Sequence, residues 1–283
     1  MIEGKPSRTA MVVAAHRADH QILENGMIFQ DPLALRLIGE DSDHILQGDV
    51  AASHMRTSVR LSIAARARAA EDAVADEVSK GLTQLVVLGA GLDSFAYRNP
   101  HGARLQVFEV DLPATQAWKL ERLTAAKIAI EPWVNHVAVD FETEGFLPGL
   151  IKAGFDPKRR SFFMWMGVVY YLTEPAMFST LSDIASLPGG ATLVFDYLEP
   201  MQAMQSGMQS TMKEIATRVA ALGESLITFF SPQDLHTRLT ATGFNGIEDW
   251  VLTELAMRYL PGTIFPPGSG SAHVLLAHSP FKF

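Results

Sequence analysis

Short apolar runs, each about the length of a β-strand, recur through the middle of the chain. They cover residues 85–88, 105–110, 134–139, 162–166 and 192–195. None alternates regularly between polar and apolar positions, as a strand with only one buried face would. Helix-like stretches lie between these runs, at residues 113–128, 146–153 and 174–186. The alternation predicts a doubly wound α/β fold whose sheet is mostly parallel and buried on both faces.

The N-terminal part of the chain has a helical pattern instead. Alanine-rich periodic segments run over residues 9–20 and 53–79. Asp31 followed by Pro32 is typical of a further helix start, with an acidic N-cap and proline in the first turn. We therefore expect a helical cap over residues 1–80.

The spacing between strand candidates becomes longer toward the C-terminus. A helical insertion at about 201–222 precedes a shorter helix at 232–242. Two more strand candidates, 246–252 and 272–277, are joined by a Gly/Pro-rich stretch at 260–270, which suits an antiparallel hairpin.

These segments add up to one α/β domain over residues 1–283. In this interpretation the helical cap packs on a cofactor-binding core, residues 81–283, which contains the helical insertion.

Composition excludes several classes of chemistry. The chain has no cysteine, which rules out disulfides, thiolate metal sites and a cysteine nucleophile. Its 31 acidic against 23 basic residues argue against a nucleic-acid partner. No signal peptide and no apolar stretch of the ~18 residues that a membrane span needs are present. We expect a cytoplasmic protein that acts on a small molecule, without a membrane partner.

A glycine turn after the first strand carries the strongest local signal. The run 85–88 is followed directly by Gly89, Ala90 and Gly91. Glycine permits positive φ and lets a ligand lie against bare backbone. The next strand ends at Asp111, at the offset where a carboxylate accepts hydrogen bonds from ribose hydroxyls. This pairing favours a nucleoside-containing cofactor over a turn that merely joins a strand to a helix.

The identity of that cofactor depends on three further positions. A dinucleotide fingerprint would place a third glycine where the chain has Ser94, and a Walker lysine is absent. The third strand ends at Asp140, followed by Phe141, an acid and an aromatic ring that suit the amino group and face of an adenine. Both Asp111 and Asp140 could instead be helix N-caps.

Several short strings occur together and in a fixed order. They are Thr9-Ala10 with Arg17-Ala18, DPLA at 31–34, LGAGLDSFAYR at 88–98, FEVDLP at 108–113, GVVYYL at 167–172, Gly223-Glu224 before FFSP at 229–232, and Gly243-Phe244. This set resembles the leucine carboxyl methyltransferase-like family, which includes TcmP-type bacterial O-methyltransferases of natural-product pathways. The resemblance covers residues 7 to 244 or beyond.

The resemblance implies a class I, Rossmann-like methyltransferase that uses S-adenosyl-L-methionine and releases S-adenosyl-L-homocysteine. The acceptor would be a carboxyl or hydroxyl group of a small, largely apolar metabolite of the polyketide type. A protein C-terminal carboxylate is a further activity in the family.

The family's cofactor-binding positions carry over to this chain. Glycines lie under the methionine part, an acid binds the ribose, an acid and an aromatic residue bind the adenine, and an arginine holds the cofactor carboxylate. The matching residues are Arg66, Gly89, Ala90, Gly91, Asp111, Leu112, Asp140, Phe141 and Met166.

Met166 departs from the family pattern, because many relatives have Glu at this position. A carboxylate there can contact the cofactor's amino group, whereas methionine cannot. The departure leaves open a cofactor-binding enzyme that catalyses a cyclisation or isomerisation instead of methylation. The sequence also leaves open an NAD-dependent oxidoreductase, which Ser94 disfavours, and a non-catalytic binding module.

In methyl transfer from a sulfonium, the protein mainly aligns the reactants and excludes water, so the sequence need not contain a catalytic dyad. Tyr170 and Tyr171 follow the fourth strand and could orient an acceptor, or they could pack in the core. His16 and His20 share a helix face and are weaker candidates, either for a base or for an ordinary surface role. No third ligand accompanies them, so we expect no metal site.

A stripe of methionines in the helical insertion allows two interpretations. Met201, Met204, Met208 and Met212 fall at helical spacing. They could form an adaptable lid over an apolar substrate, or pack in the core or at a homodimer contact.

Overall fold

The computed structural model describes residues 7–39, 53–143, 145–204, 206–265 and 270–282. Its sheet has the strand order β3-β2-β1-β4-β5-β7-β6. The strands are β1 (Gln84–Leu88), β2 (Gln106–Asp111), β3 (Val134–Ala138), β4 (Ser161–Trp165), β5 (Ala191–Leu198), β6 (Asn245–Val251) and β7 (Ala272–Ser279). Strands β1 to β5 pair in parallel, and β7 runs antiparallel to both β5 and β6. The predicted doubly wound sheet with an antiparallel C-terminal pair is confirmed.

Burial on both faces explains why the strands read as continuous apolar runs. Every residue of β1 is buried. Leu85 and Val87 pack into one core cluster, and Val86 and Leu88 pack into another on the opposite face. A central parallel strand therefore needs apolar side chains at odd and even positions alike.

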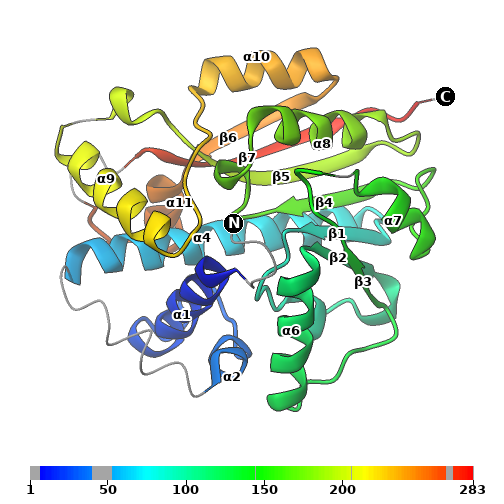
Figure 1. The fold of residues 1–283 in the computed structure, drawn as a ribbon, viewed down its shortest axis with the longest axis horizontal. Helices are drawn as coiled ribbons and strands as arrows, with labels where there is room; N and C mark the ends of the chain where they lie inside the picture. The colour runs from blue at the N-terminus through cyan, green and yellow to red at the C-terminus, as the bar shows by residue number, and fades with distance from the viewer. Residues whose placement is uncertain (1–6, 40–52, 144, 205, 266–269, 283) are drawn as a thin grey trace.

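Helices cover both faces of this sheet (Figure 1). The core cluster on one face includes residues of α4 (Ser53–Ser79), α5 (Phe95–Arg98) and α11 (Leu252–Tyr259). The cluster on the other face includes residues of α7 (Leu147–Lys152), α8 (Glu174–Ser186) and α10 (Pro232–Thr242). Helix α6 (Pro113–Ala125) packs beside β2 and β3. Gly243, with φ of +112°, ends α10 in the left-handed conformation.

The N-terminal segment is helical, as expected, and is called the cap below. Helix α1 (Arg8–Leu23) packs on α4 and on the short helix α2 (Ala34–Ile38). Asp31 does not occupy the formal N-cap position of α2, which is Leu33. Its Oδ1 nevertheless accepts hydrogen bonds from the amides of Leu33 and Ala34, both at 3.2 Å, so it satisfies the helix start as an N-cap would.

The C-terminal third differs from the sequence prediction at two places. The insertion predicted at 201–222 is not one helix but a short 3₁₀ turn, Met201–Ala203, and then α9 (Ser206–Ala221). The hairpin of β6 and β7 also contains a whole helix, α11, in its connection. Leu252, Leu255 and Ala256 are buried at helical spacing there. The Gly/Pro-rich stretch that follows them concealed this signal in the sequence.

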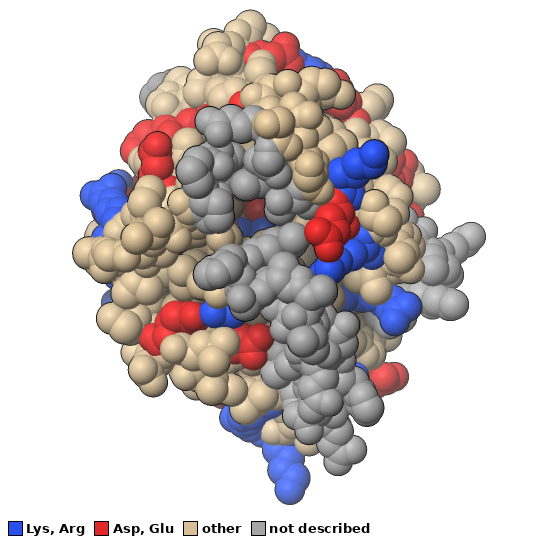
Figure 2. All heavy atoms as spheres, turned by 90° about the vertical axis from the view of Figure 1, so that its left-hand side faces the viewer, with Lys and Arg blue, Asp and Glu red and all other residues tan. Residues whose placement is uncertain are grey.

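The helices and one face of the surface can be compared with the expectations from composition. Across the described residues, no helix is long and apolar enough to cross a membrane. On the face that Figure 2 presents, acidic and basic side chains are interspersed in small groups. No broad basic patch is visible in that view.

A buried ion cluster joins the cap to the core. The Asp31 side chain has no solvent exposure and accepts a 2.9 Å hydrogen bond from Arg17 Nε and a 2.7 Å bond from Ser94 Oγ. Arg98 Nε lies 3.6 Å from the same carboxylate. Arg17 also donates to the carbonyl of Leu92, at 2.5 Å, in the segment that follows the glycine turn. Asp31 therefore fixes the position of the cap relative to that turn.

We expect Asp31→Asn to lower the free energy of unfolding by about 3–5 kcal/mol at neutral pH, because Arg17 loses its buried counter-ion, whereas Arg98 keeps Glu71. Burial alone would raise the pKa of Asp31, but Arg17 and Arg98 hold it below its usual value. A lowered pKa stabilises the fold above about pH 4, and this contribution is lost at lower pH. The loss caused by the substitution should therefore shrink in acid, as measured by urea unfolding across pH.

Asp72→Asn is the matched control, because Asp72 pairs with Arg68 on the exposed face of α4. It should cost less than about 0.5 kcal/mol. Equal losses from both substitutions would contradict a special role for Asp31.

Candidate functional site

A cavity of about 830 Å³ opens where the carboxyl ends of β1, β2 and β4 meet the N-terminal cap. Most of the residues that the sequence singled out line it. They are Arg66, Gly89, Ala90, Gly91, Asp111, Leu112, Asp140, Phe141, Met166 and Tyr171. His16, His20 and Tyr170 are not among the lining residues.

The glycine turn supplies a cavity wall without side chains. Gly89 and Gly91 have φ values of +63° and +42°, in the left-handed region that favours glycine. A Cβ atom on Gly89 would lie 2.3 Å from Val168 Cγ2. The amides of Gly89 and Ala90 donate to the carbonyl of Val110, at 2.8 and 3.1 Å. The turn is therefore closed onto β2, and its bare backbone borders the cavity.

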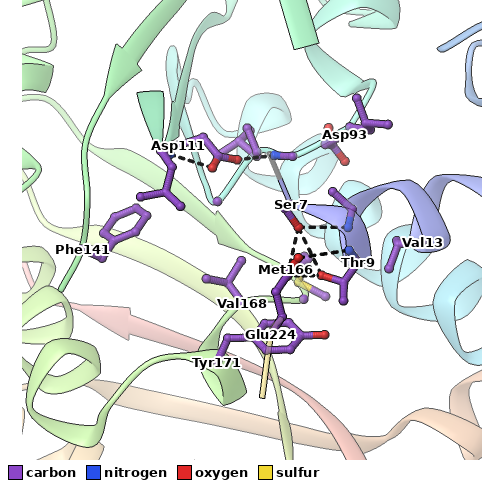
Figure 3. Close-up of a pocket in the computed structure, with 18 of the residues that line it drawn as sticks. Ser7, Thr9, Val13, Asp93, Asp111, Phe141, Met166, Val168, Tyr171 and Glu224 are labelled. Carbon is purple, nitrogen blue, oxygen red and sulfur yellow. Dashed lines mark hydrogen bonds between the residues drawn. The ribbon is translucent and has the colours of Figure 1, made fainter. Parts of the chain in front are cut away.

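Asp111 stands at the end of β2, directly beside this turn. Its Oδ2 accepts a hydrogen bond from the Gly91 amide, and its Oδ1 accepts one from the Leu112 amide at 2.7 Å. Burial raises the pKa of Asp111 to about 6, although both backbone hydrogen bonds act to lower it. Helix α6 has no side-chain cap at its N-terminus, so Asp111 is not a helix cap. Figure 3 shows the carboxylate at the edge of the cavity.

Asp140 and Phe141 follow β3 on the far side of Asp111. Asp140 Oδ1 accepts a 3.0 Å hydrogen bond from the Glu142 amide, and this bond closes a turn. The next helix, α7, has Phe146 at its N-cap position, so Asp140 is not a helix cap either. The Phe141 ring lies 6.3 Å from the Trp165 ring, centroid to centroid. An acid and an aromatic face therefore border the cavity side by side.

Arg66 reaches the cavity from α4 and is held by buried partners. Its Nη1 donates to Asp196 Oδ2 at 2.5 Å and to the Tyr170 hydroxyl at 3.1 Å. Burial acts to lower the pKa of Arg66, but the Asp196 carboxylate raises it, so the guanidinium stays charged.

The two tyrosines after β4 have different surroundings. Tyr170 is buried, and its hydroxyl is engaged by Arg66, which matches the core-packing interpretation. Tyr171 lines the cavity and packs edge-on against Tyr170, with ring centroids 4.8 Å apart. Burial raises the pKa of Tyr171 to about 12, so its phenol is neutral at physiological pH and can donate a hydrogen bond.

His20 has a structural role in the cap. It is fully buried, its Nδ1 lies 2.9 Å from Glu24 Oε2, and its Nε2 accepts from the amides of Ile28 and Phe29. Burial lowers its pKa. Within the described ranges, no group of three or more His, Cys, Asp and Glu residues is arranged to hold a metal ion.

Sequence reasoning missed Glu224, a cavity residue that is only 4% exposed. Glu224 accepts hydrogen bonds from Ser7 Oγ at 3.1 Å, the Arg8 amide at 2.7 Å, the Thr9 amide at 3.3 Å, and the Thr9 hydroxyl. Figure 3 shows Ser7, Thr9 and Glu224 converging on one another. The segment after α9 is thereby attached to the first turn of α1. The Gly223-Glu224 string was the available signal, but it did not reveal the partners.

Two methionines of the stripe are buried, among those whose side chains the structure describes. Met204 and Met212 are buried, and Met201 is half-buried. The Met208 side chain lies outside the described part of the structure. Met166, by contrast, borders the cavity and places a thioether where a carboxylate was expected from the family pattern.

Comparisons with known proteins bear on the family and the fold of this chain. The family model "Leucine carboxyl methyltransferase" matches residues 10–185. A Bacillus subtilis protein named "Putative S-adenosyl-L-methionine-dependent methyltransferase YktD" is 30% identical over 268 residues, which cover 86% of this chain and 88% of that protein.

Solved structures share the fold at low sequence identity. Magnesium protoporphyrin IX methyltransferase from Synechocystis, with S-adenosylhomocysteine bound, has a TM-score of 0.51 and 15% identity over 85% of this chain and 94% of its own. A DUF574 family protein from Streptomyces avermitilis has a TM-score of 0.59 and 13% identity, covering 97% of this chain and 98% of its own. The first of these is a methyltransferase, and the two likenesses show that the α/β fold is shared.

We expect Gly89→Ala to lower the free energy of unfolding by about 2–5 kcal/mol. About 1–2 kcal/mol comes from the left-handed backbone, and about 1–3 kcal/mol from the contact of its Cβ with Val168. Gly81 has φ of +97°, but a Cβ atom there would meet nothing within 4 Å, so Gly81→Ala should cost only the backbone part. In a Val168→Ala background, Gly89→Ala should cost less than in the wild-type background, because the closest contact of the new Cβ is removed. An equal cost in both backgrounds would mean that the two residues do not meet as described.

Proposed function

This chain belongs to the leucine carboxyl methyltransferase family, and on that premise we propose that it methylates an oxygen atom of a small, largely apolar molecule. The family, the enzyme class and the cofactor S-adenosyl-L-methionine predicted from the motifs are confirmed. S-adenosyl-L-methionine-dependent methyl transfer therefore replaces the nicotinamide and non-methylating hypotheses. The acceptor and the residue roles below are proposals.

The proposed cofactor site follows the order of the strands. Gly89, Ala90 and Gly91 would lie under the methionine part of the cofactor. Asp111 and Leu112 would bind the ribose, because each Asp111 oxygen keeps a lone pair beyond its one backbone hydrogen bond. The single cavity that all these residues share is the observation that supports this assignment.

The remaining cofactor contacts come from both sides of that turn. Asp140 and Phe141 would bind the amino group and the face of the adenine. Arg66 would hold the carboxylate of the methionine part, since a guanidinium forms forked hydrogen bonds with carboxylates. Met166 would contact the cofactor through its side chain without binding the amino group.

The acceptor would bind in the part of the cavity that the cap borders. The cavity's apolar lining includes Val13, Ile63 and Ala67 from the cap, and Val168 and Leu172 from the segment after β4. It suits an apolar molecule, and the resemblance to TcmP-type enzymes extends the proposal to acceptors of the polyketide type. Residues 1–80 and 81–283 would then act together as a single domain.

The proposed reaction is an in-line displacement. A bond forms between the acceptor oxygen and the methyl carbon while the carbon–sulfur bond breaks, and its electron pair neutralises the sulfonium. A carboxylate acceptor loses no proton in this step, whereas a hydroxyl must lose one. The neutral Tyr171 phenol would orient the acceptor oxygen by donating a hydrogen bond. Tyr170, His16 and His20 drop out of the proposal because they do not line the cavity.

Transfer of a labelled methyl group tests the acceptor class. The protein is incubated with methyl-labelled cofactor and either apolar carboxylic acids, apolar phenols or an organic extract of small metabolites. We expect label in an extractable product, and excess S-adenosyl-L-homocysteine should suppress its formation. Mild base releases the label as methanol from an ester and leaves it in an ether. Label found only on nitrogen or carbon would contradict oxygen methylation.

Asp111→Asn should weaken binding of S-adenosyl-L-homocysteine about 10- to 100-fold at pH 8, because the ribose hydroxyls lose a charged acceptor. The pKa of Asp111 is raised to about 6, so the wild-type carboxylate becomes protonated as pH falls through that value. Wild-type affinity should therefore fall by up to about tenfold per pH unit below pH 6. Isothermal titration calorimetry across pH measures both effects.

The variant should lack this pH dependence, so the two affinities should converge in acid. Glu121→Gln, on the exposed face of α6 and outside the cavity, is the control and should behave as wild type. Unchanged affinity in Asp111→Asn at pH 8 would refute the ribose role.

A further inference from the structure

Asp196, near the carboxyl end of β5, connects two parts of the cavity wall without lining the cavity itself. It is 3% exposed. Its Oδ2 accepts the 2.5 Å hydrogen bond from Arg66 Nη1, and its Oδ1 accepts a 2.5 Å hydrogen bond from the Gly167 amide. One buried carboxylate thus holds both a side chain from α4 and the turn that follows β4.

The contacts of Arg66 are confined to one end of its guanidinium. Nη1 donates to Asp196 and to the Tyr170 hydroxyl. Within the part of the chain that the structure describes, Nε and Nη2 form no hydrogen bond. A guanidinium is planar and rigid, so partners on Nη1 also fix the direction of the remaining N–H groups. Because Arg66 borders the cavity, these groups are available to a ligand there.

Gly167 makes this arrangement sterically feasible. It has φ of +78°, and a Cβ atom at this position would lie 2.9 Å from Arg66 Nη2. Only glycine lets the turn approach the guanidinium so closely. The Asp196 hydrogen bond to the Gly167 amide keeps the turn in that place.

The charges of Arg66 and Asp196 also suit a ligand with an amino-acid group. Arg66 and Asp196 form an ion pair whose side chains are 9% and 4% exposed, so the pair adds no net charge to the interior. The ammonium and carboxylate at the end of the cofactor's methionine part form a zwitterion, which is neutral as well when counted without the sulfonium. Its carboxylate can therefore join the guanidinium without leaving an uncompensated buried charge.

We propose that Asp196 is a positioning residue for the cofactor: it fixes Arg66 and the Gly167 turn so that the open side of the guanidinium meets the cofactor's carboxylate. This inference rests on the proposed role of Arg66. Asp196 itself touches no part of the cofactor in this proposal, and Tyr170 assists by occupying the second donor of Nη1.

Two ligands that differ only in the amino-acid part test the proposal. S-adenosyl-L-homocysteine has the carboxylate, whereas 5′-methylthioadenosine lacks both the carboxylate and the amino group. Asp196→Asn should weaken binding of S-adenosyl-L-homocysteine about tenfold or more, while 5′-methylthioadenosine binds within about twofold of wild type. A merely structural role would not change the ratio of the two affinities.

Asp249→Asn is the matched control, because Asp249 is also a largely buried acid, on β6, with partners Tyr197, His236 and His273. It lies outside the cavity lining and should leave the ratio unchanged. Tyr170→Phe is the milder second variant, which keeps the fold if Asp196→Asn does not. It should weaken S-adenosyl-L-homocysteine binding about two- to fivefold and spare 5′-methylthioadenosine.

A double-mutant cycle completes the test. In an Arg66→Ala background, Asp196→Asn should have no further effect on S-adenosyl-L-homocysteine affinity. Equal weakening of both ligands by Asp196→Asn, or no weakening of either, would overturn the proposal. Failure of the wild-type protein to bind S-adenosyl-L-homocysteine would instead refute the cofactor site as a whole.

Discussion

The hydrogen bond between the Gly91 amide and the Asp111 carboxylate ties the end of β1 to the end of β2. The Val110 carbonyl reinforces the link by accepting from the amides of Gly89 and Ala90. These contacts hold the glycine turn in a left-handed conformation that a side chain would disturb. This connection explains why the cavity wall at the glycine turn has no side chains and why Asp111 lies beside it. The cap, the third strand and Arg66 then enclose a site whose centre is already fixed.

Local and periodic signals explain what the sequence could predict. The unbroken apolar runs indicated strands buried on both faces, and the 20-residue offset between Gly91 and Asp111 placed both at one edge of the sheet. The residues that the sequence did not reveal have hydrogen-bond partners that are far away in the sequence. Asp196 is 130 residues from Arg66, and Glu224 lies 215 residues from Thr9. No spacing rule links such positions, because only the folded sheet and cap bring them together.

Two buried arginine–aspartate pairs connect the elements around the cavity. Arg17 with Asp31 fixes the cap to the segment after the glycine turn, and Arg66 with Asp196 fixes α4 to the end of the sheet. Apolar residues of similar volume often stabilise a core as well as a buried ion pair does. Stability alone therefore gives little reason for charges at these places. Each pair instead fixes the orientation of an arginine side chain, because the guanidinium is rigid and its carboxylate partner holds it in place.

The raised pKa of Asp111 indicates which kind of ligand would suit this carboxyl group. Its carboxylate is nearly buried and has one hydrogen bond to each oxygen, so part of its lost hydration is not replaced. That deficit is the cause of the raised pKa, near 6. A ligand that offers two neighbouring hydroxyls would supply the missing hydrogen bonds, and a phosphate would be repelled by the same charge. In the proposed cofactor site, the charge of Asp111 would therefore favour a neutral ribose over a polyanion.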